Sequence, residues 1–438
     1  MTDKTFYQLA LNETMLKVIE KLYFKTPTEI QQQAIPAILQ GKSIIGESQT
    51  GSGKTHAYLL PLFNQLDEKN ASVQIVITTP TRELAIQIFE EIKTITSLAN
   101  KEHVWNTRLI TGGIDRPRMM KQLERNPHIV VGTPGRILDM INEGVLSIYS
   151  ATAFVVDEAD LMLDFRFIDT VDELLVRSQQ DVQILVFSAT IPQQLTPFLR
   201  KYLTNPLHIK IQNGLAPEKM EHRLIDKKHH DIVEKIMDLS SVIQPYVAIL
   251  FTNSKEAADE LGNALLERGL QVGVLHGGLT SRERKRMVKA IMDHRFQYIV
   301  ATDLASRGMD IKGASHVINV ELPKELEFYI HRVGRTARAG LAGTAISFFT
   351  EKDIPLIKQL ENNGIKFIYS DVKNGEWIEV KRFNQRQSRK NVTTKLDKEA
   401  WKRVKKPKKV KPGYKKKMKQ EQERVKRRLK WESRNKKR

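Results

Sequence analysis

The chain has 438 residues, a formal net charge of +20 at pH 7 and no cysteine. The lack of cysteine excludes disulfides, thiolate metal sites and cysteine nucleophiles, and it favours an intracellular protein. No signal-peptide core follows Met1, and no apolar run approaches the roughly 20 residues that span a bilayer, so we expect a soluble, cytoplasmic protein without a membrane partner.

The positive charge is concentrated at one end of the chain. Residues 381–438 contain 27 lysines and arginines and 5 acidic residues, whereas residues 1–380 contain 44 and 46. A near-neutral body with a polycationic tail predicts an enzyme that carries an electrostatic arm for nucleic acid. Aromatic residues lie among these cations and would stack on bases, and residues 420–431 have the spacing of a basic helix. The alternative is a disordered tail that only confers solubility.

The first part of the chain has the pattern of an α/β domain. Apolar residues at helical spacing predict helices near 11–22 and over 29–39. Strands and helices then alternate, which predicts a mostly parallel sheet with helices on both faces over residues 1–212. The predicted strands are 43–46, 74–79, 107–111, 128–132, 153–156 and 183–187.

A second series of the same type follows an interruption at 213–220, which we interpret as a linker. It predicts a second α/β domain over 221–370, because a chain of this length exceeds one hydrophobic core. The periodicity fades from residue 371, so we expect residues 371–438 to be a basic, largely disordered tail. The predicted strands of the second series are 246–252, 271–275, 297–302, 315–320 and 343–350.

A glycine-rich loop follows the strand at 43–46. The segment Gln49-Thr50-Gly51-Ser52-Gly53-Lys54-Thr55 ends a strand and opens an apolar helix. Backbone N–H groups in such a loop bind phosphates, with Lys54 directed at the terminal phosphates and Thr55 at Mg²⁺. The alternative is an ordinary glycine-rich turn without a ligand, but the strand-loop-helix context favours the phosphate site. The general pattern has glycine where this chain has Ser48.

Two adjacent carboxylates end the buried strand at 153–156. Asp157 would hold Mg²⁺, directly or through water, because this ion prefers oxygen ligands. Glu158 would orient the attacking water. Polar clusters follow the other strands too, and ligands bind at the carboxyl ends of parallel strands. We therefore expect one functional face per domain, with a cleft between the two faces.

The motifs resemble, in order, those of DEAD-box ATP-dependent RNA helicases, over residues 6 to about 350. The resemblance implies two tandem RecA-like domains, and the tail is similar to those of the bacterial cold-shock helicase B group. The matching motifs are the phosphate loop, Pro80-Thr81-Arg82-Glu83-Leu84-Ala85, Gly112-Gly113, Thr133-Pro134-Gly135-Arg136, Asp157-Glu158-Ala159-Asp160, Ser188-Ala189-Thr190, Ala301-Thr302-Asp303, Arg307-Gly308-Met309-Asp310 and His331-Arg332-Val333-Gly334-Arg335-Thr336-Ala337-Arg338.

The resemblance implies ATP as the nucleotide. Phe6 and Gln31 match the adenine-recognition motif at 6–31, where an aromatic ring stacks on the purine and an amide pairs with its edge. Asp310 matches a residue near the ribose. Arg335 and Arg338 match arginines that stabilise charge on the terminal phosphate.

The resemblance also implies an RNA-facing set and an interdomain set. Hydroxyl, arginine and backbone donors would grip phosphates without reading bases. The predicted RNA-facing residues are Thr81, Arg82, Gly113, Thr133, Arg136 and Thr302. His331 would couple the second domain to Ser188 and Thr190 of the first.

Some positions depart from the family pattern, while the residues assigned to phosphate, metal and water match it. The departures are Tyr23, Ser48, Ser281, Ser306 and Ala337. The sequence therefore predicts a monomeric RNA-stimulated ATPase that remodels structured or ribosomal RNA, in ribosome assembly, RNA turnover or cold adaptation, with ribosomal or RNA-decay proteins as partners. The alternatives are a DNA helicase and an ATP-binding RNA clamp or annealing scaffold with little turnover.

Overall fold

The computed structural model describes most of the chain before residue 381 and a few short pieces of the tail. The described residues are 5–49, 51–113, 115–211, 220–228, 230–303, 311, 313–336, 343–380, 382, 403–404, 418, 421–425 and 427–428. Residues Met1–Glu379 form one compact unit and Val380–Arg438 a second. In the second unit, residues 421–425 and 427–428 are helical, within the segment where the sequence predicts a basic helix.

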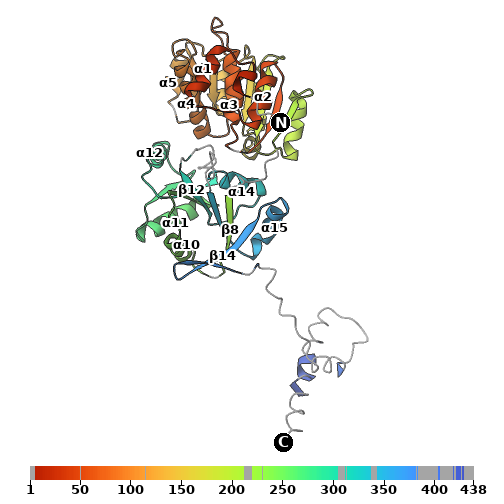
Figure 1. Ribbon diagram of the computed structural model, residues 1–438, viewed down its shortest axis with the longest axis vertical. Helices are drawn as coiled ribbons and strands as arrows, with labels where there is room; N and C mark the ends of the chain where they lie inside the picture. Colours follow the sequence, from red (N-terminus) through yellow and green to blue (C-terminus); the bar gives the residue numbers. More distant parts are fainter. Residues whose placement is uncertain are drawn as a thin grey trace. The chain divides into compact units, whose positions relative to one another are not determined.

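The first domain, residues 5–211, is coloured from red through yellow in Figure 1. It contains a parallel sheet in the order β3-β4-β2-β5-β6-β1-β7. All six strands predicted for this domain are confirmed. Its strands are β1 (Ile44–Glu47), β2 (Ile75–Thr78), β3 (Thr107–Ile110), β4 (Ile129–Gly132), β5 (Ala153–Asp157), β6 (Gln183–Ser188) and β7 (Leu207–Lys210).

Two apolar clusters cover the two faces of this sheet. Along β5, Val155 belongs to one cluster while Phe154 and Val156 belong to the other, as the alternation of side chains in a strand requires. Helices α1 to α4 contribute to the first cluster and α5 to α9 to the second. The helices are α1 (Glu13–Lys21), α2 (Glu29–Leu39), α3 (Lys54–Asn64), α4 (Arg82–Leu98), α5 (Arg116–Leu123), α6 (Pro134–Asn142), α7 (Ala159–Asp164), α8 (Ile168–Val176) and α9 (Thr196–Tyr202), with 3-10 turns η1 (Phe6–Gln8) and η2 (Gln193–Leu195).

The second domain, residues 220–379, has a sheet in the order β10-β11-β9-β12-β13-β8-β14-β15. Its pairings are parallel except that of β14 with β15. The strands are β8 (Met220–Asp226), β9 (Val247–Thr252), β10 (Val272–Leu275), β11 (Tyr298–Thr302), β12 (Ala314–Asn319), β13 (Gly343–Phe349), β14 (Phe367–Lys373) and β15 (Glu376–Glu379). The described helices are α10 (Ile232–Val242), α11 (Lys255–Glu267), α12 (Ser281–Met292), α14 (Leu326–Val333) and α15 (Ile354–Asn362), with the 3-10 turn η3 (Glu351–Asp353).

Strands β7, β8, β14 and β15 are not in the sequence prediction. Only Ile209 is buried in β7, and β15 has no buried residue, so neither carries the apolar run that signals a strand. The second sheet therefore continues past residue 370, where the sequence predicts the tail to begin. Most of the predicted linker lies outside the described residues.

Short-range capping places the helix starts directly after the strand ends. Thr81 follows β2, and its Oγ1 accepts a hydrogen bond from Leu84 N at the start of α4. Ser254 caps α11 in the same way after β9. In both domains the loops at the carboxyl ends of the strands are thus fixed by the helices that follow them. No helix of the described residues is long and apolar enough to cross a membrane.

Candidate functional site

The glycine-rich loop after β1 is held by contacts among its own residues. Lys54 is 8% exposed, and its Nζ donates a hydrogen bond of 2.6 Å to Ser48 O. The hydroxyls of Ser48 and Ser52 lie 2.8 Å apart. Gly53 has a φ of +92° and is the N-cap of α3, a conformation that glycine adopts without strain. Strand, loop and helix are therefore arranged as a phosphate site requires.

Gln31 connects the start of α2 to this loop. Its Nε2 donates a hydrogen bond of 3.2 Å to Gly53 O, and its Oε1 accepts one of 3.0 Å from Thr28 N. Phe6 is buried and stacks on Phe24 at a centroid distance of 6.4 Å. Gln31 thus borders the phosphate loop, and the roles of Phe6 and Gln31 toward adenine stay predictions. The predicted ligand residues Thr50 and Asp310 lie outside the described residues.

The carboxylates after β5 are buried beside α3. Tyr58 donates its hydroxyl to Asp157 Oδ2 at 2.9 Å, and Glu158 N donates to Asp157 Oδ1 at 3.0 Å. Burial and the neighbouring charge of Glu158 raise the pKa of Asp157 to about 6. Glu158 has a φ of +51°, and its Oε2 is buried without a hydrogen-bond partner among the described residues. A carboxylate held at high pKa and an unsatisfied carboxylate oxygen suit a divalent cation, so the residues fit Mg²⁺.

Asp160 is the point where the predicted coupling residues meet. Its Oδ2 accepts hydrogen bonds from Thr190 N at 3.0 Å and Thr190 Oγ1 at 3.1 Å, and its backbone N donates to Ser188 Oγ at 3.0 Å. His331 Nε2 of the second domain lies 3.3 Å from the same Oδ2. Burial opposes ionisation of Asp160, but His331 and the hydrogen bonds outweigh it and hold its pKa far below the usual range.

Helix α14 carries His331 and the buried Arg332, and the turn that follows it carries the buried Arg335. Arg332 is 1% exposed, and its guanidinium forms a bidentate pair with Asp303 at 2.6 and 2.7 Å. It also donates to Asn319 Oδ1, Glu321 O and Asn253 Oδ1. Arg335 is 4% exposed and donates from Nε to His331 O at 3.2 Å. The predicted catalytic residue Arg338 lies outside the described residues.

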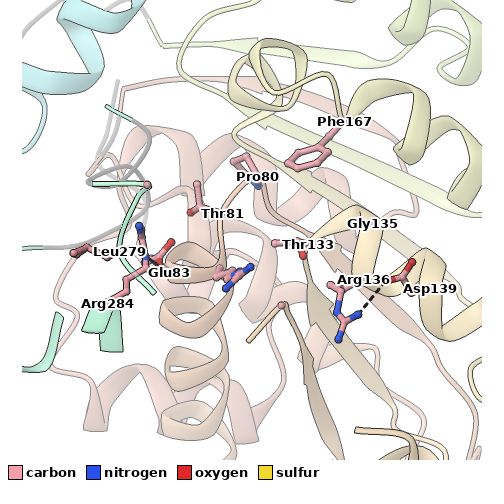
Figure 2. Close-up of a pocket in the computed structure, with 13 residues that line it drawn as sticks. Pro80, Thr81, Glu83, Thr133, Gly135, Arg136, Asp139, Phe167, Leu279 and Arg284 are labelled. Carbon is pink, nitrogen blue, oxygen red and sulfur yellow. Dashed lines mark hydrogen bonds and ion pairs between the residues drawn. The ribbon is translucent and has the colours of Figure 1, made fainter. Parts of the chain in front are cut away.

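A cavity of about 550 Å³ collects the loops that the sequence predicts to face RNA (Figure 2). The lining residues from the first domain are Pro80, Thr81, Arg82, Glu83, Gly112, Thr133, Gly135, Arg136, Asp139 and Phe167, and those from the second are Gly277, Leu279 and Arg284. We call this cavity the groove. Four predicted residues line it, and Gly113 follows a lining residue. Thr302 ends β11 and is not among the lining residues.

Two contacts shape the groove. The Arg82 guanidinium lies against Gly112, where a Cβ atom would come within 2.6 Å of Arg82 Nη2. Arg284 Nε of α12 donates to Glu83 Oε1 of α4 at 2.5 Å, and both side chains are mostly buried. This cross-domain pair was not among the predicted site residues.

His276 holds the second-domain loop of the groove. Its Nδ1 accepts a hydrogen bond of 3.0 Å from Gly278 N, so Nε2 carries the proton and donates it to Asp259 Oδ1 at 2.8 Å. The ring is 5% exposed. The loop that places Gly277 and Leu279 in the groove is therefore fixed from behind by one histidine tautomer.

Sequence reasoning also missed Arg332, Asp303 and Tyr58 as supports of the site. Tyr58 is four residues after Lys54 on α3, so helical spacing places the two side chains on one face. Nothing in the local sequence indicates that Asp303 pairs with Arg332, because 29 positions separate them.

Comparisons with known proteins agree with this geometry. The profile of the DEAD/DEAH box helicase family matches residues 28–198, and that of the helicase conserved C-terminal domain matches residues 228–340. The DEAD-box ATP-dependent RNA helicase CshB of Bacillus cereus is 47% identical over 98% of this chain and 98% of its own, and CshB of Bacillus subtilis is 48% identical over 97% of each.

Solved structures with the same fold include helicases captured with RNA. Dbp5 of S. cerevisiae bound to RNA and ADP BeF3 has a TM-score of 0.76 at 29% identity, covering 84% of this chain and 95% of that one. Mss116p bound to ssRNA and AMP-PNP has a TM-score of 0.74 at 26% identity, covering 85% and 80%. The chain belongs to the family of DEAD-box ATP-dependent RNA helicases, and the CshB relatives confirm its predicted resemblance to the cold-shock helicase B group.

Proposed function

We propose that this chain hydrolyses ATP at the phosphate loop and carboxylates of the first domain when RNA occupies the groove, and that the cycle opens RNA duplexes locally. The observation that carries the proposal is the meeting at Asp160. Thr190 of the first domain and His331 of the second both contact one carboxylate oxygen, two residues after Glu158. A movement of the second domain would thus change the contacts of Asp160, two residues from Glu158, which orients the attacking water in this proposal.

In this proposal the first domain binds the nucleotide. The loop backbone and Lys54 hold the phosphates, while Phe6 and Gln31 select adenine. Thr55 and Asp157 would hold Mg²⁺, which supplies charge neutralisation at the phosphates. Glu158 accepts a hydrogen bond from the attacking water and orients it. Its buried, unsatisfied Oε2 supports that role.

The second domain supplies cations and closes the groove. Arg335, together with Arg338, stabilises the charge that develops on the transferred phosphoryl group. ATP and RNA each bind the closed arrangement better than the open one, so each favours binding of the other. The buried Arg284–Glu83 pair supports a closed arrangement in which the groove has walls from both domains.

RNA binding in the groove is independent of base sequence. Thr81, Arg82, Thr133 and Arg136 present hydroxyl and guanidinium donors, which suit phosphates and sugars rather than base edges. The cationic tail adds a second, purely electrostatic contact. Removal of residues 381–438 should weaken RNA binding and flatten its salt dependence. Unchanged affinity in the truncated protein would leave the tail with a role in solubility only.

The decisive experiment measures ATP turnover with and without RNA. We expect RNA to stimulate turnover and DNA of the same sequence to do so far less, because the 2′-hydroxyl and A-form geometry separate the two polymers. Turnover that ignores RNA would contradict the coupling. Tight ATP and RNA binding with little turnover would instead favour a clamp or annealing scaffold.

Glu158→Gln separates binding from hydrolysis. The amide retains the shape but accepts a proton poorly, so turnover should fall about 100-fold or more while ATP and RNA still bind. The exposed Glu267→Gln on α11 is the matched control and should behave as the unmodified protein. Near-normal turnover of Glu158→Gln would remove that residue from the mechanism.

The physiological setting is a further part of the proposal. We propose a cytoplasmic monomer that acts on structured or ribosomal RNA in ribosome assembly, RNA turnover or cold adaptation, with ribosomal or RNA-decay proteins as partners. The relatives named as DEAD-box ATP-dependent RNA helicases of the CshB type support RNA as the substrate and are consistent with cold adaptation. Sedimentation of RNA-bound particles from cold-grown cells, with and without the gene, measures it: an unaltered ribosome and RNA profile would contradict it.

A further inference from the structure

Helix α12 carries four exposed cations on one face. Arg282, Lys285, Arg286 and Lys289 follow the spacing i, i+3, i+4 and i+7, which places them within one stripe. The opposite side of the helix holds the buried Ile291. We call these four residues the cationic stripe.

Few acidic groups neutralise the positive charge of the cationic stripe. The single acidic residue of α12, Glu283, accepts hydrogen bonds from Thr280 N at 2.9 Å and Thr280 Oγ1 at 2.7 Å, so it serves as part of the helix cap. Among the described residues, Arg282, Lys285 and Lys289 have no ion-pair partner. Like charges at these spacings destabilise a helix. Residues 1–380 as a whole are close to neutral, so the stripe is a local excess of positive charge.

The start of α12 belongs to the groove. Gly277 and Leu279 precede the helix and Arg284 lies in its first turn, and all three line the groove (Figure 2). Helix α12, labelled in Figure 1, contacts β10, the edge strand of the second sheet. A polyanion that leaves the groove past Leu279 therefore reaches the N-terminal end of the helix that carries the stripe.

We propose that the cationic stripe of α12 binds the phosphate backbone of RNA that flanks the groove. The stripe covers roughly 10 Å along the helix, a length that spans two to three phosphates of one strand. It adds contacts on the second domain, apart from the tail. The inference rests on the proposed RNA binding in the groove and names an additional surface for it.

The test replaces all four cations by glutamine in the full-length chain, because glutamine keeps helix propensity and removes charge. RNA affinity is measured by fluorescence anisotropy from 50 to 500 mM salt, with a single-stranded RNA long enough to extend beyond the groove. Each lost phosphate contact lowers the salt slope by about 0.7, so the loss of two to three contacts should lower it by roughly 1.5 to 2 and, at 0.1 M salt, reduce the affinity roughly tenfold or more.

Two matched variants interpret the result. Glutamine at the exposed Lys352, Lys358, Lys366 and Lys373 removes the same net charge elsewhere in the second domain and should leave the slope unchanged. Exchange of lysine for arginine and arginine for lysine within the stripe keeps its charge and should keep the affinity. Circular dichroism melts verify that all variants fold.

The outcomes separate this inference from the proposed function. If RNA stimulates the ATPase of the unmodified protein but the stripe variant keeps its salt slope, only the stripe proposal fails, and the stripe would then suit an acidic protein surface. An equal loss in the Lys352 set would also overturn it, because the effect would then come from net charge. If RNA does not stimulate the unmodified protein, the proposed function fails first.

Discussion

The phosphate loop of the first domain and helix α14 of the second are stabilised at different ranges along the chain. In the loop, Lys54 binds the carbonyl of Ser48, six positions away. In α14, Arg332 binds Asp303 and Asn253, 29 and 79 positions away. The phosphate loop is thus stabilised by residues close in sequence. Helix α14 is stabilised by residues from three loops that are distant in sequence.

This difference predicts which substitutions should destabilise the fold in each domain. A local loop can lose one side chain and keep its backbone path, because neighbouring contacts and the helix behind it remain. A buried guanidinium with five acceptors leaves several polar groups unsatisfied when it is removed. We expect substitutions in the second domain to affect folding and those in the loop to affect function.

The largest effect is expected for Arg332→Met. It leaves the Asp303 carboxylate and Asn319 without their partner, so the free energy of unfolding should fall by about 3 to 5 kcal/mol in urea. Lys54→Met is the counterpart in the loop and should cost about 1 kcal/mol, since one hydrogen bond to a carbonyl is lost. Equal losses for the two variants would contradict the contrast between the regions.

His222 should make the second domain sensitive to acid. Its Nδ1 lies 2.8 Å from the Tyr329 hydroxyl, and burial lowers the pKa of the imidazole from 6.5 to about 4. The unfolded chain therefore takes up a proton before the folded chain does, and stability falls as pH drops from 6.5 towards 4. The loss is on the order of 3 kcal/mol.

His222→Asn removes the titrating group and should flatten that pH dependence. Urea midpoints measured between pH 7 and pH 4 test it, with the exposed His230→Asn as control. A variant that stays as acid-sensitive as the unmodified protein would assign the effect to other groups.

Gly53→Ala tests the local construction of the loop. The positive φ strains any side chain by about 1 to 2 kcal/mol, and the new Cβ would lie 2.7 Å from Gln31 Nε2. ATP affinity and thermal stability should both fall. In a Gln31→Ala background the loss should be smaller, because the 2.7 Å contact is removed and only the 3.0 Å approach to Thr28 Oγ1 remains. A double-mutant cycle measures that coupling. Strictly additive losses would show that the two residues are independent.

The smallest effect is expected at Tyr23, in the first domain. This residue is 88% exposed at a φ of +58°, a conformation that costs an L-residue about 1 to 2 kcal/mol. Tyr23→Gly should therefore raise the free energy of unfolding by about 1 kcal/mol. Tyr23→Asn should give a smaller gain, since asparagine tolerates this region only in part. A loss of stability would mean that the ring makes contacts that outweigh the strain.

Prediction from sequence succeeds where the signal is local. Apolar runs and the loops after them identify eleven strands. Asp157 ends β5, Thr81 follows β2, and Lys54 begins the helix after the loop that follows β1. The strands β7 and β15 are not predicted from the sequence, because pairing with a neighbouring strand, rather than an apolar run, defines them. One departure from the family pattern, Tyr23, adopts a positive φ, a conformation that glycine adopts without strain.

Long-range contacts remain beyond such reasoning. Tyr58 binds Asp157 from 99 positions away, and Arg284 reaches Glu83 across 201. Each of these residues has an ordinary local setting, a helix face or a basic run, so composition and spacing favour no partner. The pairs become visible only when two sheets and their loops are folded together.

Glu158 has a consequence for engineering this protein. It adopts a left-handed backbone conformation, and one of its side-chain oxygens lacks a hydrogen bond among the described residues, so this position opposes stability. Selection for heat resistance alone should favour glycine or asparagine there, and under the proposed mechanism the resulting protein would be more stable but would not hydrolyse ATP. Screens for thermostable variants therefore need an activity step that protects this one residue.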